Sequence, residues 1–450
     1  MQLNKNRVRI IGAGLAGCEA AFQMARFGIK VDLYEMKPKK RTPAQVSDHF
    51  AELVCSNSFR SNNPCNAVGL IKEEMRRAGG FLIACAEEAK VPAGDALAVD
   101  REQFAKAVQS RLLAEPNINI ISEEVSELID DDVATIVATG PLTSDALALH
   151  ISQVIGQERL AFYDAIAPII DADSVDMEHA FFASRWGKGE GDDYLNCPMT
   201  QIEYEQFFHA LISADQAHAK AFENLHYFEG CLPIEELASR GEKTLLFGPL
   251  KPVGLRHPVT GQRAHAVLQL RKENIHGTAY NLVGCQTRMT QPAQKAVFAQ
   301  IPALRNAQFL RFGAIHRNTY LDAPLILDET SRLKTESNQY ENIFFAGQIT
   351  GVEGYVESMA SGLIVAKLLQ AILKQKPINP PPETTTLGGL YRHTRGILRA
   401  NPKDRYVPSN VTWAMLPPIA ESNRKLGKDA KRQMLVERAL ADLHQWLAGQ

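Results

Sequence analysis

The stretch VRIIGAGLAGCEAAFQMARFGIKVDLYE, residues 8–35, decides the fold of this chain. An apolar run leads into the loop GAGLAG, a helix-forming segment follows, and a second apolar run ends in an acidic residue. This order predicts a β-α-β unit, with the glycine loop between the first strand and the helix. The chain is therefore expected to be an α/β protein with a Rossmann-like, dinucleotide-binding domain.

Each glycine of the loop has a separate task. Gly12 permits the tight turn, Gly14 lets backbone amides approach a pyrophosphate, and Gly17 lets the helix pack closely on the strand. Glu35 ends the second strand about twenty residues on, where a carboxylate accepts a hydrogen bond from a ribose hydroxyl and disfavours a 2′-phosphate. The predicted cofactor contacts here are Gly12, Ala13, Gly14, Leu15, Ala16, Gly17 and Glu35.

Two later segments indicate which dinucleotide is bound. ATIVATG, residues 134–140, reads as a strand ending in a small-residue turn, and residues 342–369, NIFFAGQITGVEGYVESMASGLIVAKLL, read as a strand, a glycine-rich turn and a long helix. This pairing resembles the two-dinucleotide flavoprotein fold, in which a late strand and helix return to the first domain. The resemblance implies FAD, with Gly140, Gly347 and Gln348 as further contacts and Tyr355 beside the flavin or pterin ring.

The chain of 450 residues is long enough for more than one domain. Residues 171–308 are poorer in β-α-β alternation and richer in mixtures of charged and aromatic residues, and they are expected to form an inserted α+β domain. Residues 1–170 and 309–450 would then form a discontinuous FAD-binding domain. A proline-rich linker, 374–387, is expected to lead to a basic tail that includes YRHTRGILRANPKDR and NRKLGKDAKRQ. The tail suits phosphate contact or, equally, a solvated helical face.

Composition excludes several classes of protein. The chain has a net charge of −2, so a nucleic-acid partner must be held by a local basic patch. It shows no signal peptide and no long uncharged apolar run, and it is expected to be cytoplasmic with no membrane partner. Its seven cysteines are scattered without C-x-x-C spacing, and the histidines show no metal-binding motif, so no metal is expected. Among the histidines, His316 in GAIHRNTY merits most attention.

Two cysteines are candidate catalytic residues. Cys55, in AELVCSNSFRSN, is followed by hydrogen-bonding residues and Arg60, a polar and partly cationic setting that favours a thiolate. Cys231, in HYFEGCLPIEELA, precedes a Leu-Pro pair that is expected to start a helix, and a helix N-terminus also acidifies a thiol. For both residues the alternative is ordinary core packing.

The motifs LVCSNS and EGCLPIEELA, together with the glycine loop, ALAVDRE, HRNTY and FAGQITGVEGYVES, resemble the folate- and FAD-dependent tRNA (uracil-5-)-methyltransferases, in order and over nearly the whole chain. The resemblance implies transfer of a methylene from methylenetetrahydrofolate to the 5-carbon of the T-loop uridine that becomes ribothymidine. It further implies reduced FAD as reductant, NADH or NADPH as the external electron source, and tRNA as partner.

The reaction needs two ionisable groups. Uracil becomes nucleophilic at its 5-carbon only after a thiolate adds at the 6-carbon, and a base must later remove the 5-proton. The resemblance places Cys231 as the nucleophile and Cys55 as the base, although these roles could be exchanged. One alternative is the sister family of FAD-dependent enzymes that modify the wobble uridine of tRNA, and chain length argues against it. Another is an RNA-binding flavoprotein whose cofactor is structural.

Overall fold

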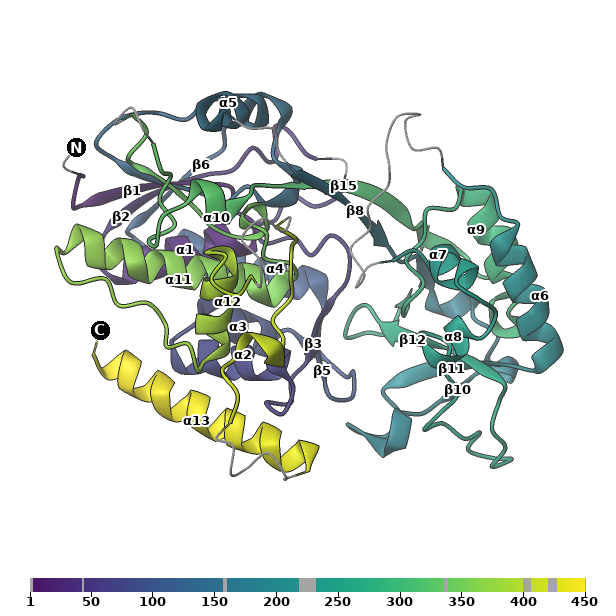
Figure 1. Cartoon of the computed structure of the whole chain (residues 1–450). Coiled ribbons are helices and arrows are strands. Elements are labelled where there is room, and N and C mark those ends of the chain that lie inside the picture. Colours follow the sequence, from purple (N-terminus) through teal and green to yellow (C-terminus); the bar gives the residue numbers. More distant parts are fainter. Residues whose placement is uncertain are drawn as a thin grey trace.

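The computed structural model describes residues 3–42, 44–156, 160–217, 232–335, 339–399, 406–419 and 427–449, with only the backbone described at 160–166 and 315–318. It consists of two bodies joined by a long two-stranded ribbon (Figure 1). The ribbon pairs β8 (Leu160–Ile166) with β15 (Ala314–Tyr320) in antiparallel register. Each body has its own hydrophobic core.

The first body contains the parallel sheet that the sequence predicts. Its strands are β1 (Arg7–Ile11), β2 (Lys30–Tyr34), β6 (Ile118–Ile121), β7 (Ala134–Val137) and β16 (Ile343–Phe345), in the order β16-β7-β1-β2-β6. All four pairings are parallel. The late strand β16 returns to pair with β7, as the flavoprotein pattern predicted.

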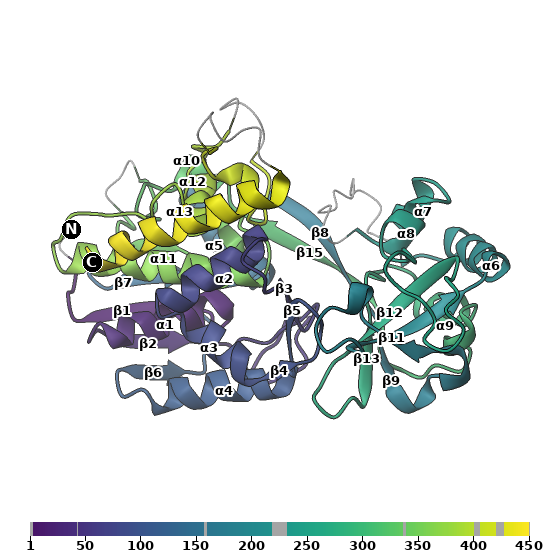
Figure 2. The ribbon, with the colours of Figure 1, turned by 90° about the horizontal axis from the view of Figure 1, so that it is seen from below.

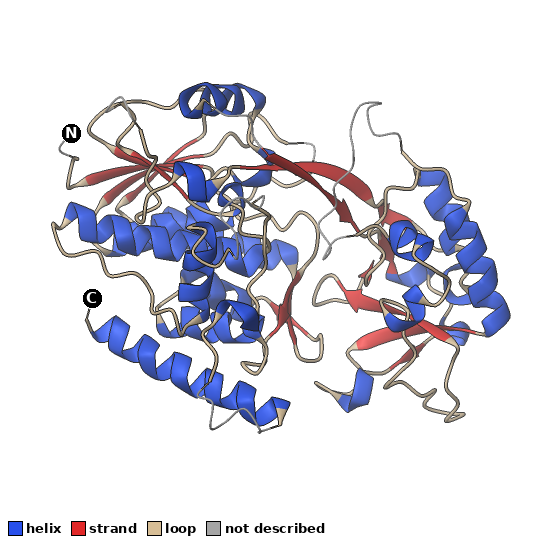
Figure 3. Cartoon of the chain, in the orientation of Figure 1, coloured by secondary structure: helices blue, strands red, loops and turns tan. Residues whose placement is uncertain are grey.

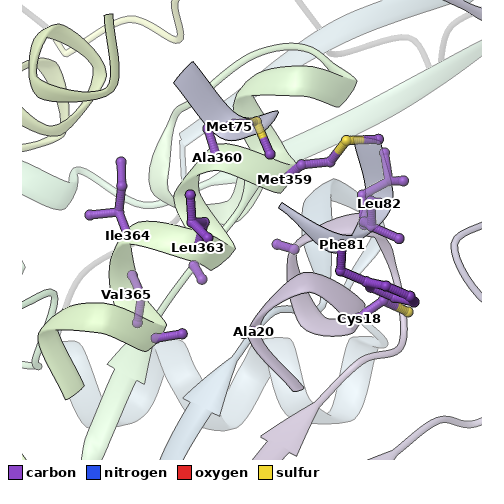
Figure 4. Packing of buried hydrophobic residues seen from close by; sticks show 14 of the residues in the cluster. Cys18, Ala20, Met75, Phe81, Leu82, Met359, Ala360, Leu363, Ile364 and Val365 are labelled. Carbon is purple, nitrogen blue, oxygen red and sulfur yellow. The ribbon is translucent and has the colours of Figure 1, made fainter. Parts of the chain in front are cut away.

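Two helices that are far apart in the sequence pack closely on this sheet. They are α1 (Leu15–Arg26) and α11 (Tyr355–Leu373). A Cβ on Gly362 would lie 2.2 Å from the carbonyl oxygen of Ala16, so only glycine permits this approach. Figure 4 shows Ala360, Leu363 and Val365 of α11 among the buried side chains of this core.

Helix α11 is also long and apolar enough, by length and composition, to cross a membrane. In this protein 78% of its apolar window is buried, and its neighbours are α1 and the sheet, so its composition is that of a core helix. No other helix in the described part of the chain passes the same test.

Further helices cover the first body, as Figure 3 shows in blue around the red strands. They are α2 (Ala67–Arg77), α3 (Phe81–Glu88), α4 (Arg101–Ala114), α5 (Asp145–Ile155) and α10 (Ala323–Ile326). A small antiparallel sheet of β3 (Ser58–Ser61), β5 (Ala96–Val99) and β4 (Lys90–Val91) lies at the side that faces the second body (Figure 2).

The second body is built on a six-stranded sheet whose pairings are all antiparallel, in the order β10-β11-β12-β13-β9-β14. Its strands are β9 (Ile169–Asp171), β10 (Phe181–Phe182), β11 (Tyr194–Met199), β12 (Ala266–Lys272), β13 (Ala279–Leu282) and β14 (Phe309–Arg311). Helices α6 (Gln201–Ile212), α7 (Ile234–Ser239), α8 (Thr244–Phe247) and α9 (Gln291–Phe298) accompany it. Strand β9 begins two residues before the expected domain limit of 171, and β14 follows the expected limit of 308.

The C-terminal region differs from the expected linker and tail. The linker limit of 387 falls inside α12 (Thr386–Thr394), whose first amides donate to the buried carboxylate of Glu74 on α2, each over 2.8 Å. In the first basic segment, Arg392 pairs with Glu383 and Arg399 with Asp322, each at 3.1 Å, so part of the positive charge is neutralised internally. The second segment leads into α13 (Lys428–Ala448), which lies along the first body and packs Val436 and Ala439 against Leu70 (Figure 2).

Candidate active site

A cleft lies at the carboxyl ends of the parallel strands, where α/β folds bind their ligands. Its volume, counted out into open solvent, is about 1040 Å³. The predicted cofactor residues that line it are Gly12, Gly14, Leu15, Ala16, Glu35, Gly140, Gly347, Gln348 and Tyr355. Segments separated by more than 300 positions thus meet at one surface.

The glycine loop has the shape that a dinucleotide requires. Gly12 has a φ of +100°, and a Cβ there would lie 2.8 Å from the carbonyl oxygen of Ala138. A Cβ on Gly17 would lie 1.8 Å from the carbonyl oxygen of Gly12. A Cβ on Gly14 would meet no atom within 4 Å, so it would project into open space of the cleft. Gly14 precedes the first turn of α1, whose free amides suit a pyrophosphate.

The remaining cofactor residues surround this loop. The buried carboxylate of Glu35 accepts the amides of Ala13, over 3.0 Å, and Lys37, over 3.1 Å, which fixes it at the end of β2. Ala13 is buried and contributes this amide rather than a side chain. A Cβ on Gly347 would lie 2.7 Å from the Cβ of Ala16, so the late turn rests on the first turn of α1. These features fit the FAD that the fold implies.

Cys55 adjoins the cleft, since Val54 and Tyr355 line it. The Sγ of Cys55 lies 2.9 Å from the hydroxyl of Tyr355, and that hydroxyl oxygen also accepts the amides of Cys55, over 2.8 Å, and Ser56, over 3.1 Å. Two amides occupy both lone pairs, so the phenolic proton is left for the sulfur. Burial raises the pKa of Tyr355 well above its ordinary value, which keeps this proton in place. Tyr355 is therefore a hydrogen-bond donor to Cys55.

Three guanidinium groups interact electrostatically with Cys55, those of Arg101, Arg271 and Arg311. Arg101 starts α4, donates to the carbonyl of Leu53 and pairs with Glu273 at 2.7 Å. The predicted cationic setting of Cys55 is thus present, but its source differs from the expected Arg60. Arg60 instead turns to the fully buried Glu357 of α11, at 2.5 Å.

The loop that carries Cys55 lies where the two bodies touch, and Asn57 is its main anchor. The buried amide of Asn57 donates to Val99 of the first body, over 3.0 Å, and to the carbonyl of Lys272 of the second, over 2.9 Å. Its Oδ1 accepts Nε of Arg271 over 2.8 Å, while Nη2 of Arg271 donates to Ser56 over 3.0 Å. The polar residues after Cys55 therefore form hydrogen bonds that connect the two bodies.

The side chains of two residues singled out from the sequence, Cys231 and His316, are not among those that the structure describes. Cys231 lies outside the described residues, so its distance from Cys55 stays open. The helix expected after it, α7, begins at Ile234. For His316 only the backbone is described, as part of β15.

Sequence reasoning missed Arg271, Glu273 and Arg311. All three lie in or beside strands of the second body, and the sequence offers no local motif that separates them from other charged strand residues. Arg101 falls within ALAVDRE, a motif that contributes to the family resemblance but predicts no role for a single residue.

Comparison with known proteins gives one family match and many similar chains. Residues 7–377 match the model of the family described as "Glucose inhibited division protein A". A methylenetetrahydrofolate–tRNA-(uracil-5-)-methyltransferase TrmFO of Geobacter sulfurreducens is 51% identical over 441 residues, covering 98% of this chain and 99% of the relative. A protein of the same name from Anaeromyxobacter dehalogenans is 50% identical over 446 residues, covering 99% and 97%.

Among solved structures, GidA of Aquifex aeolicus superposes with a TM-score of 0.67 at 15% identity, covering 98% of this chain and 75% of that one. At this identity the match bears on the fold alone. It agrees with the parallel sheet and its late returning strand.

Proposed function

We propose that the chain methylates the 5-carbon of a uridine in tRNA. The premise is its family: the chain belongs to the glucose inhibited division protein A family and, within it, to the methylenetetrahydrofolate–tRNA-(uracil-5-)-methyltransferases. The single observation that carries the chemistry is a thiol beside a dinucleotide cleft, held by a phenol and surrounded by guanidinium groups. We further propose the T-loop uridine as target, methylenetetrahydrofolate as one-carbon donor and NADH or NADPH as electron source.

FAD is proposed to occupy the cleft. The amides of the first turn of α1 would bind its pyrophosphate, and Glu35 would accept a ribose hydroxyl. When bound, reduced FAD supplies the hydride that converts the transferred methylene to methyl. The chain's own task at this point is to hold the ring beside Tyr355 and thus beside Cys55.

Cys55 is proposed as the base that removes the proton from the 5-carbon after the new bond has formed. A thiolate can do so because the hydroxyl of Tyr355 donates to it and the three arginines favour its negative charge. Once protonated, Cys55 returns the proton to solvent and is ready for another cycle. The loop around Cys55 is held in position because the hydrogen bonds of Asn57 and Arg271 connect it to both bodies.

Cys231 is proposed as the nucleophile that adds to the 6-carbon of uracil and leaves when the 5-proton is removed. This assignment rests on family resemblance. The inserted domain that carries Cys231 is proposed to bring it to the cleft together with the tRNA, and the opposite assignment of the two cysteines is the alternative.

The substrate is tested by mass spectrometry of tRNA from cells that lack the protein. We expect T-loop ribothymidine to be absent and the wobble modifications to be intact. The opposite pattern would move the protein to the sister family, and no change in either modification would support a flavoprotein with a structural cofactor.

The roles of the two cysteines are tested with tRNA that contains 5-fluorouridine, because fluorine at the 5-carbon cannot leave as a proton does. We expect Cys55→Ala to form a covalent complex on a denaturing gel without turnover, and Cys231→Ala to form none. The reverse result exchanges the roles. Normal methylation by Cys55→Ala contradicts a catalytic role for that thiol.

A further inference from the structure

Arg311 is a cation of the second body that reaches the first. It ends β14, where it pairs with Ile169 of β9, and its Nη2 lies 3.5 Å from the carbonyl oxygen of Ala44. Two residues close to Ala44 in the chain, Thr42 and Gln45, line the dinucleotide cleft. The guanidinium therefore lies at the edge of the cleft, within electrostatic reach of Cys55, Tyr355, Arg101 and Glu52.

The charges around Arg311 differ in how they are neutralised. Arg101 has Glu273 at 2.7 Å, and Arg271 donates two hydrogen bonds to the Cys55 loop, to Asn57 and Ser56. Among the residues that the structure describes, Arg311 has no carboxylate within ion-pair distance, and the one hydrogen bond of its side chain there, to Ala44, is long.

The carboxylate of Glu52 is not an ion-pair partner of Arg311. Its Oε1 accepts the amides of Val46, over 2.8 Å, and Ser47, over 3.0 Å, while its Oε2 faces the buried ammonium of Lys37 at 3.5 Å. The carboxylate of Glu52 thus binds groups of its own segment of the chain.

A half-buried guanidinium without an ion-paired carboxylate is unfavourable. Burial, and then the charge of Arg101, lower the pKa of Arg311 from its ordinary value, which reports the cost of holding the charge there. A guanidinium presents a planar fork that binds carboxylate and phosphate through two parallel hydrogen bonds. An oxyanion at this point would relieve both the desolvation and the repulsion from Arg101.

We infer that Arg311 is a binding residue that receives an oxyanion of one substrate at the edge of the cleft, next to the reacting thiol. The inference rests on the proposed function. Two sources share this chemistry: a phosphodiester of the RNA beside the target uridine, and a carboxylate of the glutamate carried by the folate.

The test uses Arg311→Met, which keeps the length of the side chain and removes the charge, and Arg311→Lys, which keeps the charge and removes the fork. The matched control is Arg305→Met, an exposed arginine six positions earlier in the same body. FAD content and thermal unfolding are measured first, and Arg311→Met is expected to keep its FAD and to be at least as stable as the wild type. Loss of FAD from Arg311→Met would overturn the inference, because the residue would then serve the resident cofactor or the fold.

Binding is measured without turnover, so the result is independent of whether methylation is the reaction. Unmodified tRNA is titrated by filter binding over a series of salt concentrations. Tetrahydrofolate, and a tetrahydropterin that lacks the benzoylglutamate, are titrated by quenching of FAD fluorescence. We expect Arg311→Met to weaken one of the two ligands by about 10- to 100-fold, as expected for loss of a charged hydrogen bond, with partial recovery in Arg311→Lys.

The two sources give separate patterns. If the anion is a phosphate, the salt slope of tRNA binding falls by roughly one unit and tetrahydrofolate binding is unchanged. If it is the carboxylate, tetrahydrofolate binding weakens, the pterin without glutamate binds wild type and variant alike, and the salt slope stays the same. Equal weakening of both ligands, or affinities within twofold of the Arg305→Met control, would overturn the inference.

Discussion

The hydroxyl oxygen of Tyr355 lies 2.9 Å from the sulfur of Cys55, although the two residues are 300 positions apart in the chain. Tyr355 starts the helix that follows the late glycine-rich turn, and Cys55 lies in the loop before β3. The contact therefore joins the dinucleotide cleft to the thiol. It assigns Tyr355 a hydrogen-bonding task in addition to its predicted place beside the flavin.

Tyr355→Phe is expected to move the pH profile of Cys55 alkylation to higher pH, because the thiolate loses its phenolic donor. Stability should fall by about 1–3 kcal/mol, since the half-buried amides of Cys55 and Ser56 also lose their acceptor. Alkylation is followed by mass spectrometry of the Cys55 peptide with iodoacetamide, and stability by denaturant unfolding.

The matched control is Tyr391→Phe, which loses a hydroxyl that donates to the carbonyl of Glu329 over 2.9 Å, away from Cys55. It should lower stability without moving the alkylation profile. An unchanged profile in Tyr355→Phe would contradict the donor role.

Gly14→Val and Gly17→Ala are expected to fail in different ways. At Gly14 the new side chain enters open space of the cleft, so the fold should remain and FAD binding should be lost. At Gly17 even one methyl group lies 1.8 Å from the carbonyl of Gly12, so the fold itself should lose stability, by roughly 1–3 kcal/mol or more. Flavin absorbance and thermal unfolding of both variants separate the outcomes. A yellow Gly14→Val protein would contradict the proposed position of the pyrophosphate.

The sequence was sufficient for the first body because its signals are local. The spacing of Gly12, Gly14 and Gly17 and the acid at the end of β2 express the geometry of one turn, and a turn can be read from neighbouring residues. The late strand β16 could be placed beside the first domain only through resemblance, since no local pattern determines a pairing between residues 200 positions apart.

The charged groups around Cys55 could not be predicted from the residues next to it in the sequence. Arg60 is five positions away and was expected to supply positive charge, but burial of Glu357 draws its guanidinium to α11. The charge comes instead from Arg101, Arg271 and Arg311, and two of these belong to strands of the second body. Contacts between two bodies depend on how the bodies pack, and the sequence pattern within either one does not encode this.

Asn57→Ala is expected to disturb Cys55 as well as the fold. It removes two donated hydrogen bonds and leaves Nε of Arg271 without its acceptor, which should cost about 2–4 kcal/mol. The control is Asn196→Ala, another fully buried asparagine, whose amide donates to Phe181 and Ala183 inside the second body. Both variants should lose stability, and only Asn57→Ala should change the rate of Cys55 alkylation. Equal rates in the two variants would show that Asn57 serves the fold alone.

Neutralising the basic residues before and within the first turns of α13 is expected to weaken tRNA binding. The substituted residues are Arg424, Lys425, Lys428, Lys431 and Arg432, of which the first two lie outside the described residues. Each lost phosphate contact should reduce the salt slope of binding by roughly one unit. An unchanged slope in filter binding would mean that the segment is a solvated helical face.

Lys72 is expected to make the stability of the protein rise with pH above neutrality. Its ammonium is fully buried on α2, donates to the carbonyl of Phe59 over 2.8 Å, and has its pKa lowered to about 7 by burial and by Arg60. Between pH 7 and the unfolded value near 10.5, the unfolded chain binds the proton more tightly than the folded protein does. The free energy of unfolding should therefore rise through this range, by at most about 1.4 kcal/mol per pH unit.

Lys72→Met removes the titrating group and should flatten this part of the profile, whereas exposed Lys428→Met should leave it intact. Denaturant unfolding of the three proteins at pH 7, 8 and 9 provides the measurement. The difference between wild type and Lys72→Met isolates the contribution of Lys72, because the thiols and tyrosines titrate in both. If the two profiles run parallel, Lys72 keeps its charge in the folded protein, and the carbonyl of Phe59 together with the nearby Glu357 would then be sufficient to hold a buried ammonium.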